Sequence, residues 1–138
     1  SPSPAAIENH QTAGVVLYVE DDPACVQVVT AALALRPAVT LRTAGTASEG
    51  IAMARSEAVD AILLDIGLPD GSGWDLLLAV RELPEMASIP VVVLTAGPGV
   101  VPPGVPGPDR IMTKPLDIVA CIEAIDELLA PTVDVSRH

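Results

Sequence analysis

The feature that most constrains the fold is an apolar run that ends in one carboxylate, Asp65, ahead of a loop containing Gly and Pro. The run from Ala61 to Leu64 shows no polar alternation, so it predicts a strand covered on both faces, as in a parallel sheet flanked by helices. Asp65 then lies at the carboxyl end of this strand, where open α/β sheets bind their ligands. Aspartate is also a common turn residue, so Asp65 gains functional meaning only from its neighbours.

Further apolar runs alternate with helical patterns along the chain. The other expected strands are residues 15–19, 39–44, 91–96 and 110–114, and the expected helices are 23–36, 46–58, 72–83 and 117–130. Asp22 is a good N-cap, with Pro23 at the first helical position. The core-facing residues expected in the last helix are Ile118, Ile122, Ile125 and Leu129. The alternation predicts an α/β fold with a doubly wound, five-stranded parallel sheet.

One connection departs from this alternation. Residues 97–108 read G-P-G-V-V-P-P-G-V-P-G-P, with five prolines and four glycines in twelve residues. Proline lacks a backbone donor and glycine costs the most entropy to order, so this stretch cannot form a regular helix. We therefore predict an irregular, mobile crossover between the fourth and fifth strands.

Length and composition exclude several classes of protein. The 138 residues fit one domain, which we place at 14–131 between a flexible tail at 1–13 and a short tail at 132–138. No apolar run approaches the ~20 residues needed to cross a bilayer, and Cys25 and Cys121 show no paired spacing, so we expect a reducing, cytoplasmic setting. A formal net charge of −11 argues against direct nucleic-acid or membrane partners.

Polar groups stand at four of the expected strand ends: Glu20 and Asp21, Asp65, Thr95 and Lys114. Converging carboxylates repel one another unless a cation intervenes, and hard oxygen ligands favour Mg²⁺. Thr95 could hydrogen-bond a phosphoryl oxygen, and Lys114 could supply a point charge. Since a carboxylate can attack phosphorus to form an acyl phosphate, the set predicts phosphoryl chemistry on Asp65.

Each of these residues also has a simpler interpretation. Glu20 and Asp21 could be helix-start residues attracted by the helix dipole. Thr95 could be an ordinary strand residue and Lys114 a solvated charge, so only their joint placement favours a site. His10 and His138 lie near the termini and are not placed to donate a phosphoryl group, which therefore comes from another protein.

The motifs resemble those of receiver domains of two-component response regulators: V-L-Y-V-E-D-D-P, L-L-D-I-G-L-P-D-G-S-G, V-V-V-L-T-A and T-K-P, over about residues 14–130. The resemblance implies a flavodoxin-like strand order 2-1-3-4-5 and a signalling phosphoacceptor rather than an enzyme. Asp65 would accept phosphoryl from a histidine kinase or phosphotransfer protein. Glu20, Asp21, Asp65 and the backbone carbonyl of Gly67 would hold Mg²⁺, and Thr95 and Lys114 would contact the phosphoryl group. An output protein would read the result.

Two departures from the family pattern keep alternatives open. Family members place a helix where this chain has residues 97–108, and an aromatic residue where it has Ile111. A degenerate receiver that binds partners constitutively is therefore a second hypothesis. A third is an aspartate-nucleophile phosphatase of the dehalogenase type, which expects a second Asp at the position of Gly67.

Overall fold

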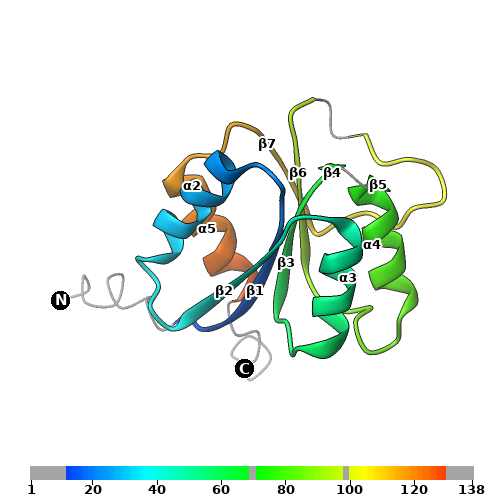
Figure 1. Ribbon diagram of the computed structural model, residues 1–138, viewed down its shortest axis with the longest axis horizontal. Helices are drawn as coiled ribbons and strands as arrows, with labels where there is room; N and C mark the ends of the chain where they lie inside the picture. Colours follow the sequence, from blue (N-terminus) through cyan, green and yellow to red (C-terminus); the bar gives the residue numbers. More distant parts are fainter. Residues whose placement is uncertain (1–11, 69–70, 98–99, 130–138) are drawn as a thin grey trace, which may run out of the picture.

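A computed structural model describes residues 12–68, 71–97 and 100–129. Five parallel strands form one sheet in the order β2-β1-β3-β6-β7 (Figure 1). Their bounds are β1 (Gly14–Val19), β2 (Val39–Ala44), β3 (Ala61–Asp65), β6 (Val91–Thr95) and β7 (Arg110–Thr113). The order 2-1-3-4-5 and the doubly wound α/β class are confirmed. A separate two-stranded ribbon, β4 (Gly67–Leu68) with β5 (Gly71–Ser72), follows β3.

In the part of the chain that the structure describes, four helices cover the two faces of the sheet. They are α2 (Pro23–Leu33), α3 (Ala47–Ser56), α4 (Gly73–Glu82) and α5 (Ile118–Leu128). Figure 1 shows α2 and α5 together on one face and α3 and α4 on the other. The helices begin at local caps: Asp22, Thr46 and Asp117 each accept a hydrogen bond from a backbone amide of the first turn, and Pro23 follows Asp22 as expected.

The core is aliphatic and split by the sheet into two layers. Strand β1 shows why, because its side chains point alternately to the two faces. Leu17 and Val19 pack in the layer under α3 and α4, whereas Val16 and Tyr18 pack in the layer under α2 and α5. All four are fully buried. A strand buried on both faces therefore lies inside the sheet, between β2 and β3, with its carboxyl end fixed in place.

The inner face of α5 agrees with the expected one at three positions, since Ile122, Ile125 and Leu129 pack in the layer under α2 and α5. Cys121, Ala124 and Ile125 are buried, whereas Ile118 is 40% exposed. The small side chains of Cys121 and Ala124 allow α5 to lie close to its neighbours, which include α2. Ile118 lies outside the core at the start of the helix, so the expectation for Ile118 was wrong.

The crossover between β6 and β7 has no helix among its described residues, 100–109. Val105 packs against the layer under α3 and α4, and its amide donates to the Pro102 carbonyl in a turn. The far end is held by Asp109, whose Oδ1 accepts from Arg81 at 2.8 Å and from the Val91 amide at 2.9 Å. Among the described residues, the Val105 side chain, the ion pair of Asp109 with Arg81 and the hydrogen bonds between Asp109 and Val91 thus attach the segment to the domain.

The proposed tails lie almost wholly outside the described residues, and the domain bounds 14–131 stay a prediction. Thr12 is described, and its hydroxyl donates to Asp126 Oδ1 at 3.0 Å. Asp126 in turn accepts two hydrogen bonds from Arg36, at 2.8 and 2.7 Å. Across the described ranges, no helix has the length and apolar character needed to cross a bilayer.

Candidate functional site

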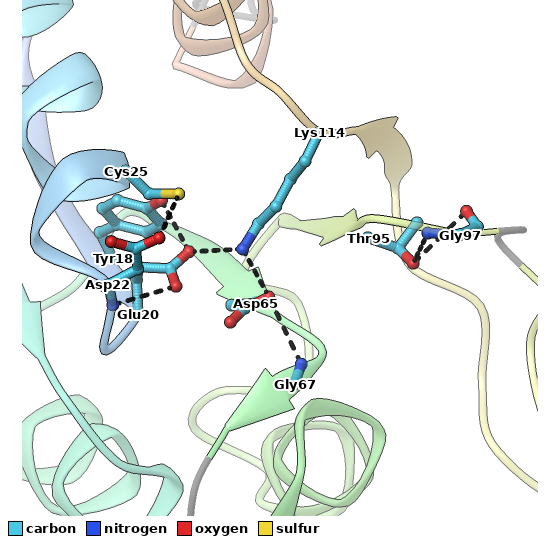
Figure 2. Close-up of polar contacts among 9 residues, drawn as sticks. All are labelled: Tyr18, Glu20, Asp22, Cys25, Asp65, Gly67, Thr95, Gly97 and Lys114. Carbon is cyan, nitrogen blue, oxygen red and sulfur yellow. Dashed lines mark hydrogen bonds and ion pairs between the residues drawn. The ribbon is translucent and has the colours of Figure 1, made fainter.

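The carboxyl ends of four strands bring the expected polar residues to one edge of the sheet. Because β1 and β6 both pair with β3, the residues after Val19 and the residue Thr95 flank Asp65. Lys114 follows β7 and reaches across from the next position (Figure 2). These residues line an open pocket of about 660 Å³ together with Asp22, Ile66, Gly67, Ala96 and Gly97.

Three carboxylates share this pocket. Oxygens of Glu20, Asp21 and Asp65 lie within 4.8 Å of one another. Glu20 and Asp65 are only 3% and 5% exposed, whereas Asp21 is exposed. Mutual repulsion at this distance is strong in a partly buried site. The arrangement therefore favours a cation close to the carboxylates.

Lys114 supplies one such cation. Its Nζ lies 2.9 Å from Glu20 Oε1 and 2.9 Å from Asp65 Oδ1. Burial acts to lower the pKa of Lys114, but the hydrogen bonds to Glu20 and Asp65 outweigh it, so the pKa of Lys114 is raised. The ammonium thus remains charged and bridges two of the carboxylates. With all three carboxylates ionised, three negative charges and one positive charge leave the site at −2.

Glu20 is held from three sides. Its Oε1 accepts from Lys114 and from the Tyr18 hydroxyl at 3.0 Å, and its Oε2 accepts from the Asp22 amide at 3.3 Å (Figure 2). Burial raises the pKa of Glu20, and the Lys114 hydrogen bond partly opposes it, while the Asp65 charge adds to the rise. Burial, with the nearby Glu20 charge, also raises the pKa of Tyr18, so its hydroxyl remains a donor.

Sequence reasoning did not identify Tyr18. The two-residue spacing between Tyr18 and Glu20 was the available signal for their contact, because residues two apart on an extended chain face the same side. Tyr18 is also the only Tyr in a chain that has no Phe. A single phenolic hydroxyl in an otherwise aliphatic core, two residues before a carboxylate, therefore indicated a hydrogen bond.

Two glycines that follow Asp65 differ in what surrounds them. A Cβ at Gly73 would lie 2.4 Å from the Asp65 carbonyl oxygen, and the Gly73 amide donates to the Ile66 carbonyl at 3.0 Å. The start of α4 is thus pressed against the backbone of the site. Gly67 is different: its amide donates to Asp65 Oδ1 at 3.4 Å, yet a Cβ there would meet nothing within 4 Å. The pocket is therefore open above Asp65.

Thr95 and Asp22 also line the pocket, but their polar atoms have other partners. Thr95 Oγ1 accepts from the Gly97 amide at 3.1 Å and donates to the Gly97 carbonyl at 3.4 Å. Asp22 accepts from the Ala24 amide at 2.9 Å and caps α2. Thr95 thus presents its hydroxyl at the pocket wall, and Asp21 rather than Asp22 is the second carboxylate facing Asp65.

The donor set fits a hard divalent cation. All three ligand candidates in the cluster are carboxylates, with no His or Cys among them. Oxygen-only sites with few protein ligands are typical of Mg²⁺, which retains several waters. The Lys114 ammonium beside them provides a point charge for an anionic group. Such a site can bind a metal ion and a phosphoryl group side by side.

Comparison with known proteins agrees with this geometry. The family model described as the response regulator receiver domain matches residues 16–126. The chain is 36% identical over 120 residues to the "Probable transcriptional regulatory protein TcrX" of Mycobacterium tuberculosis, covering 85% of this chain and 50% of that protein. It spans about half or less of the length of the first curated relatives it matches.

Solved structures show the same fold. A CheY-like receiver domain protein from Methanospirillum hungatei covers 85% of this chain and 94% of its own, at 26% identity and a TM-score of 0.73. The receiver domain of the Pseudomonas aeruginosa sensor histidine kinase PA1611, which has a magnesium ion coordinated in its active site cleft, covers 86% and 99% at 20% identity and a TM-score of 0.75. The match over residues 16–126 shows that the chain belongs to the family of response regulator receiver domains.

Proposed function

We propose that this receiver domain accepts a phosphoryl group on Asp65 from a phosphohistidine of a histidine kinase or phosphotransfer protein. The observation that carries the proposal is the position of the Asp65 carboxylate. It lies at a strand end, in an open pocket, paired with Lys114 at 2.9 Å and beside the oxygens of Glu20 and Asp21. Receiver domains as a class are signalling phosphoacceptors rather than enzymes, and the chain belongs to that class.

The proposed reaction needs no additional base. An oxygen of the ionised Asp65 carboxylate attacks phosphorus, the bond from phosphorus to the donor imidazole nitrogen breaks, and that nitrogen keeps the electron pair and takes a proton from solvent. Lys114 stays protonated and offsets charge on the incoming group. The open position at Gly67 admits the donor. Thr95 would exchange its bond with Gly97 for one with a phosphoryl oxygen.

We propose Mg²⁺ as the cofactor, held by Glu20, Asp21 and Asp65, with the backbone carbonyl of Gly67 as a further ligand. The excess of carboxylates over the single Lys114 ammonium and the all-oxygen donor set support this choice. When bound, the ion would neutralise the carboxylates and the phosphoryl oxygens. A cytoplasmic location, absence of direct nucleic-acid binding and an output protein as partner belong to the same proposal.

Intact-mass measurement tests the phosphoacceptor. Wild type incubated with phosphoramidate and Mg²⁺ should gain one phosphoryl group, and EDTA should abolish the gain. Asp65→Asn should gain none. Asp22→Asn is the matched control, because it changes a carboxylate that lines the same pocket. Asparagine also caps helices well, so the fold is kept and this variant should label like wild type. Labelling of Asp65→Asn would show that another residue is the acceptor.

A second candidate function is a constitutive interaction domain. It is favoured by the helix-free segment 100–109 and by Ile111, which is 36% exposed and has no ring to switch. Partner binding measured with and without beryllofluoride and Mg²⁺ separates the two: an affinity that does not change supports the constitutive domain. A change supports phosphoryl-dependent output.

A further inference from the structure

We propose that Tyr18 is a positioning residue for the acidic site: its buried hydroxyl orients the Glu20 carboxylate and thereby sets the affinity of the pocket for a divalent cation. The inference rests on the proposed function, in which this pocket binds Mg²⁺. It adds a residue that lies below the pocket, in the core, and that does not line the pocket itself.

The backbone places Tyr18 directly beneath Glu20. Tyr18 lies on β1, which is hydrogen-bonded to both β2 and β3, with Thr43 and Leu63 as its lateral partners. Its side chain is fully buried in the layer under α2 and α5. A tightly packed ring has little freedom to change rotamer. The hydroxyl therefore meets the Glu20 carboxylate from a fixed direction (Figure 2).

The distribution of donors shows why this contact matters. Glu20 Oε1 has two charged or polar donors, the Tyr18 hydroxyl at 3.0 Å and Lys114 Nζ at 2.9 Å. Lys114 is also paired with Asp65. Without the hydroxyl, Lys114 would be the one remaining side-chain donor to Oε1 among the described residues, and it would stay divided between two carboxylates. Glu20 would then keep only the Lys114 and Asp22 amide donors, and its carboxylate would be held less firmly in the orientation that faces the cluster.

A structural explanation of the same contact is available. Burying a hydroxyl is unfavourable unless it is hydrogen-bonded, so Glu20 could serve only to satisfy Tyr18. The composition argues against this reading: the chain uses no Phe and fills its core with aliphatic residues, yet keeps one Tyr whose hydroxyl reaches the pocket carboxylate. A purely structural contact would affect stability without affecting cation affinity.

Calorimetric titration with Mg²⁺ tests the proposal. Tyr18→Phe should weaken Mg²⁺ binding about 10-fold, the lower end of the range for residues that orient metal ligands. In a Glu20→Gln background the same change should have little further effect, because the hydroxyl acts through the Glu20 carboxylate. Val16→Ala, in the same strand and core layer, is the matched control and should lower stability while leaving Mg²⁺ affinity unchanged.

A second measurement follows Tyr18 directly by ¹⁹F NMR. Because Tyr18 is the only Tyr, 3-fluorotyrosine labels this position alone. Its ¹⁹F resonance should shift on addition of Mg²⁺ with the midpoint found by calorimetry, and the shift should disappear in Glu20→Gln. No shift in the wild type, or equal Mg²⁺ affinity in wild type and Tyr18→Phe, would overturn the role of Tyr18 alone. A wild type that binds no Mg²⁺ would overturn both this role and the proposed cofactor.

Discussion

Replacing Gly73 by alanine is a sharp test of how closely α4 is pressed against the site. The added Cβ would lie 2.4 Å from the Asp65 carbonyl oxygen and 2.9 Å from Ile66 Cα. Both are backbone atoms, so the clash cannot be relieved by a rotamer change. Because both contacts are with backbone, we take the upper part of the range for overpacking, about 2–3 kcal/mol, and subtract about 1 kcal/mol for the helix propensity that alanine regains. We expect a net loss of about 1–2 kcal/mol in the free energy of unfolding.

Urea and thermal denaturation measure this loss. For a chain of this size, about 1–2 kcal/mol corresponds to a decrease in Tm of about 3–8 °C. Gly67→Ala is the matched control, since its Cβ meets nothing within 4 Å, and its stability should stay within about 0.5 kcal/mol of wild type. Gly73→Ala should also slow phosphorylation of Asp65 by phosphoramidate, because a misplacement of about 1 Å at a reacting group can cost about 100-fold.

The reasoning fails if Gly73→Ala and Gly67→Ala unfold at the same urea concentration. That result would mean that the segment between Asp65 and α4 relaxes without cost. A second failure would be a destabilised Gly73→Ala that labels at the wild-type rate, since the position of Asp65 would then be independent of its contact with α4.

Three further predictions follow from the same contacts. Asp21→Ala should weaken Mg²⁺ binding in calorimetry more than Asp22→Ala, which should instead lose about 1 kcal/mol of stability with its helix cap; equal losses of affinity would contradict the assignment. Arg36→Ala should destabilise by about 1–2 kcal/mol at neutral pH, because it removes two charge-assisted hydrogen bonds to Asp126. The Arg36 hydrogen bonds lower the pKa of Asp126 in the folded state, so their contribution to stability is present above the pKa of Asp126 in the unfolded chain and is lost as the pH falls through its pKa in the folded protein. Urea unfolding should therefore show that the stability lost in Arg36→Ala becomes smaller in acid. A loss that does not depend on pH would refute the linkage. Gly67→Arg should slow hydrolysis of the acyl phosphate, followed by intact mass, by covering the open pocket, and an unchanged decay rate would count against shielding.

Much of the fold was predictable because its determinants are local. The strands are apolar runs buried on both faces, and α2 begins where Asp22 and Pro23 coincide, so strand ends and the polar residues after them could be read from the sequence. In a parallel sheet those ends meet at one edge, which is why Asp65 and Lys114 were expected together and lie 2.9 Å apart.

The remaining features depend on tertiary contacts. Helix α5 packs on the core through Cys121 and Ala124 as well as through Ile122, Ile125 and Leu129, and only its tertiary packing leaves Ile118 exposed. The hydrogen bond from Tyr18 to Glu20 needs a rigid extended strand and a donor in a buried position. The second donor to Glu20, Lys114, is 94 residues away along the chain. The contacts of Thr95 with Gly97 likewise arise from the turn after β6.

The outermost strand has a consequence for self-association. Strand β7 lies at the end of the sheet, and its Ile111 side chain is partly exposed because no helix occurs in residues 100–109. An exposed strand edge can pair with the edge of another molecule and seed aggregation. Here β7 has only four residues, and Pro108 and Pro115 stand on either side of it without amide hydrogens. The short length of β7 and the prolines beside it thus disfavour edge-to-edge pairing of β7 with a strand of another molecule.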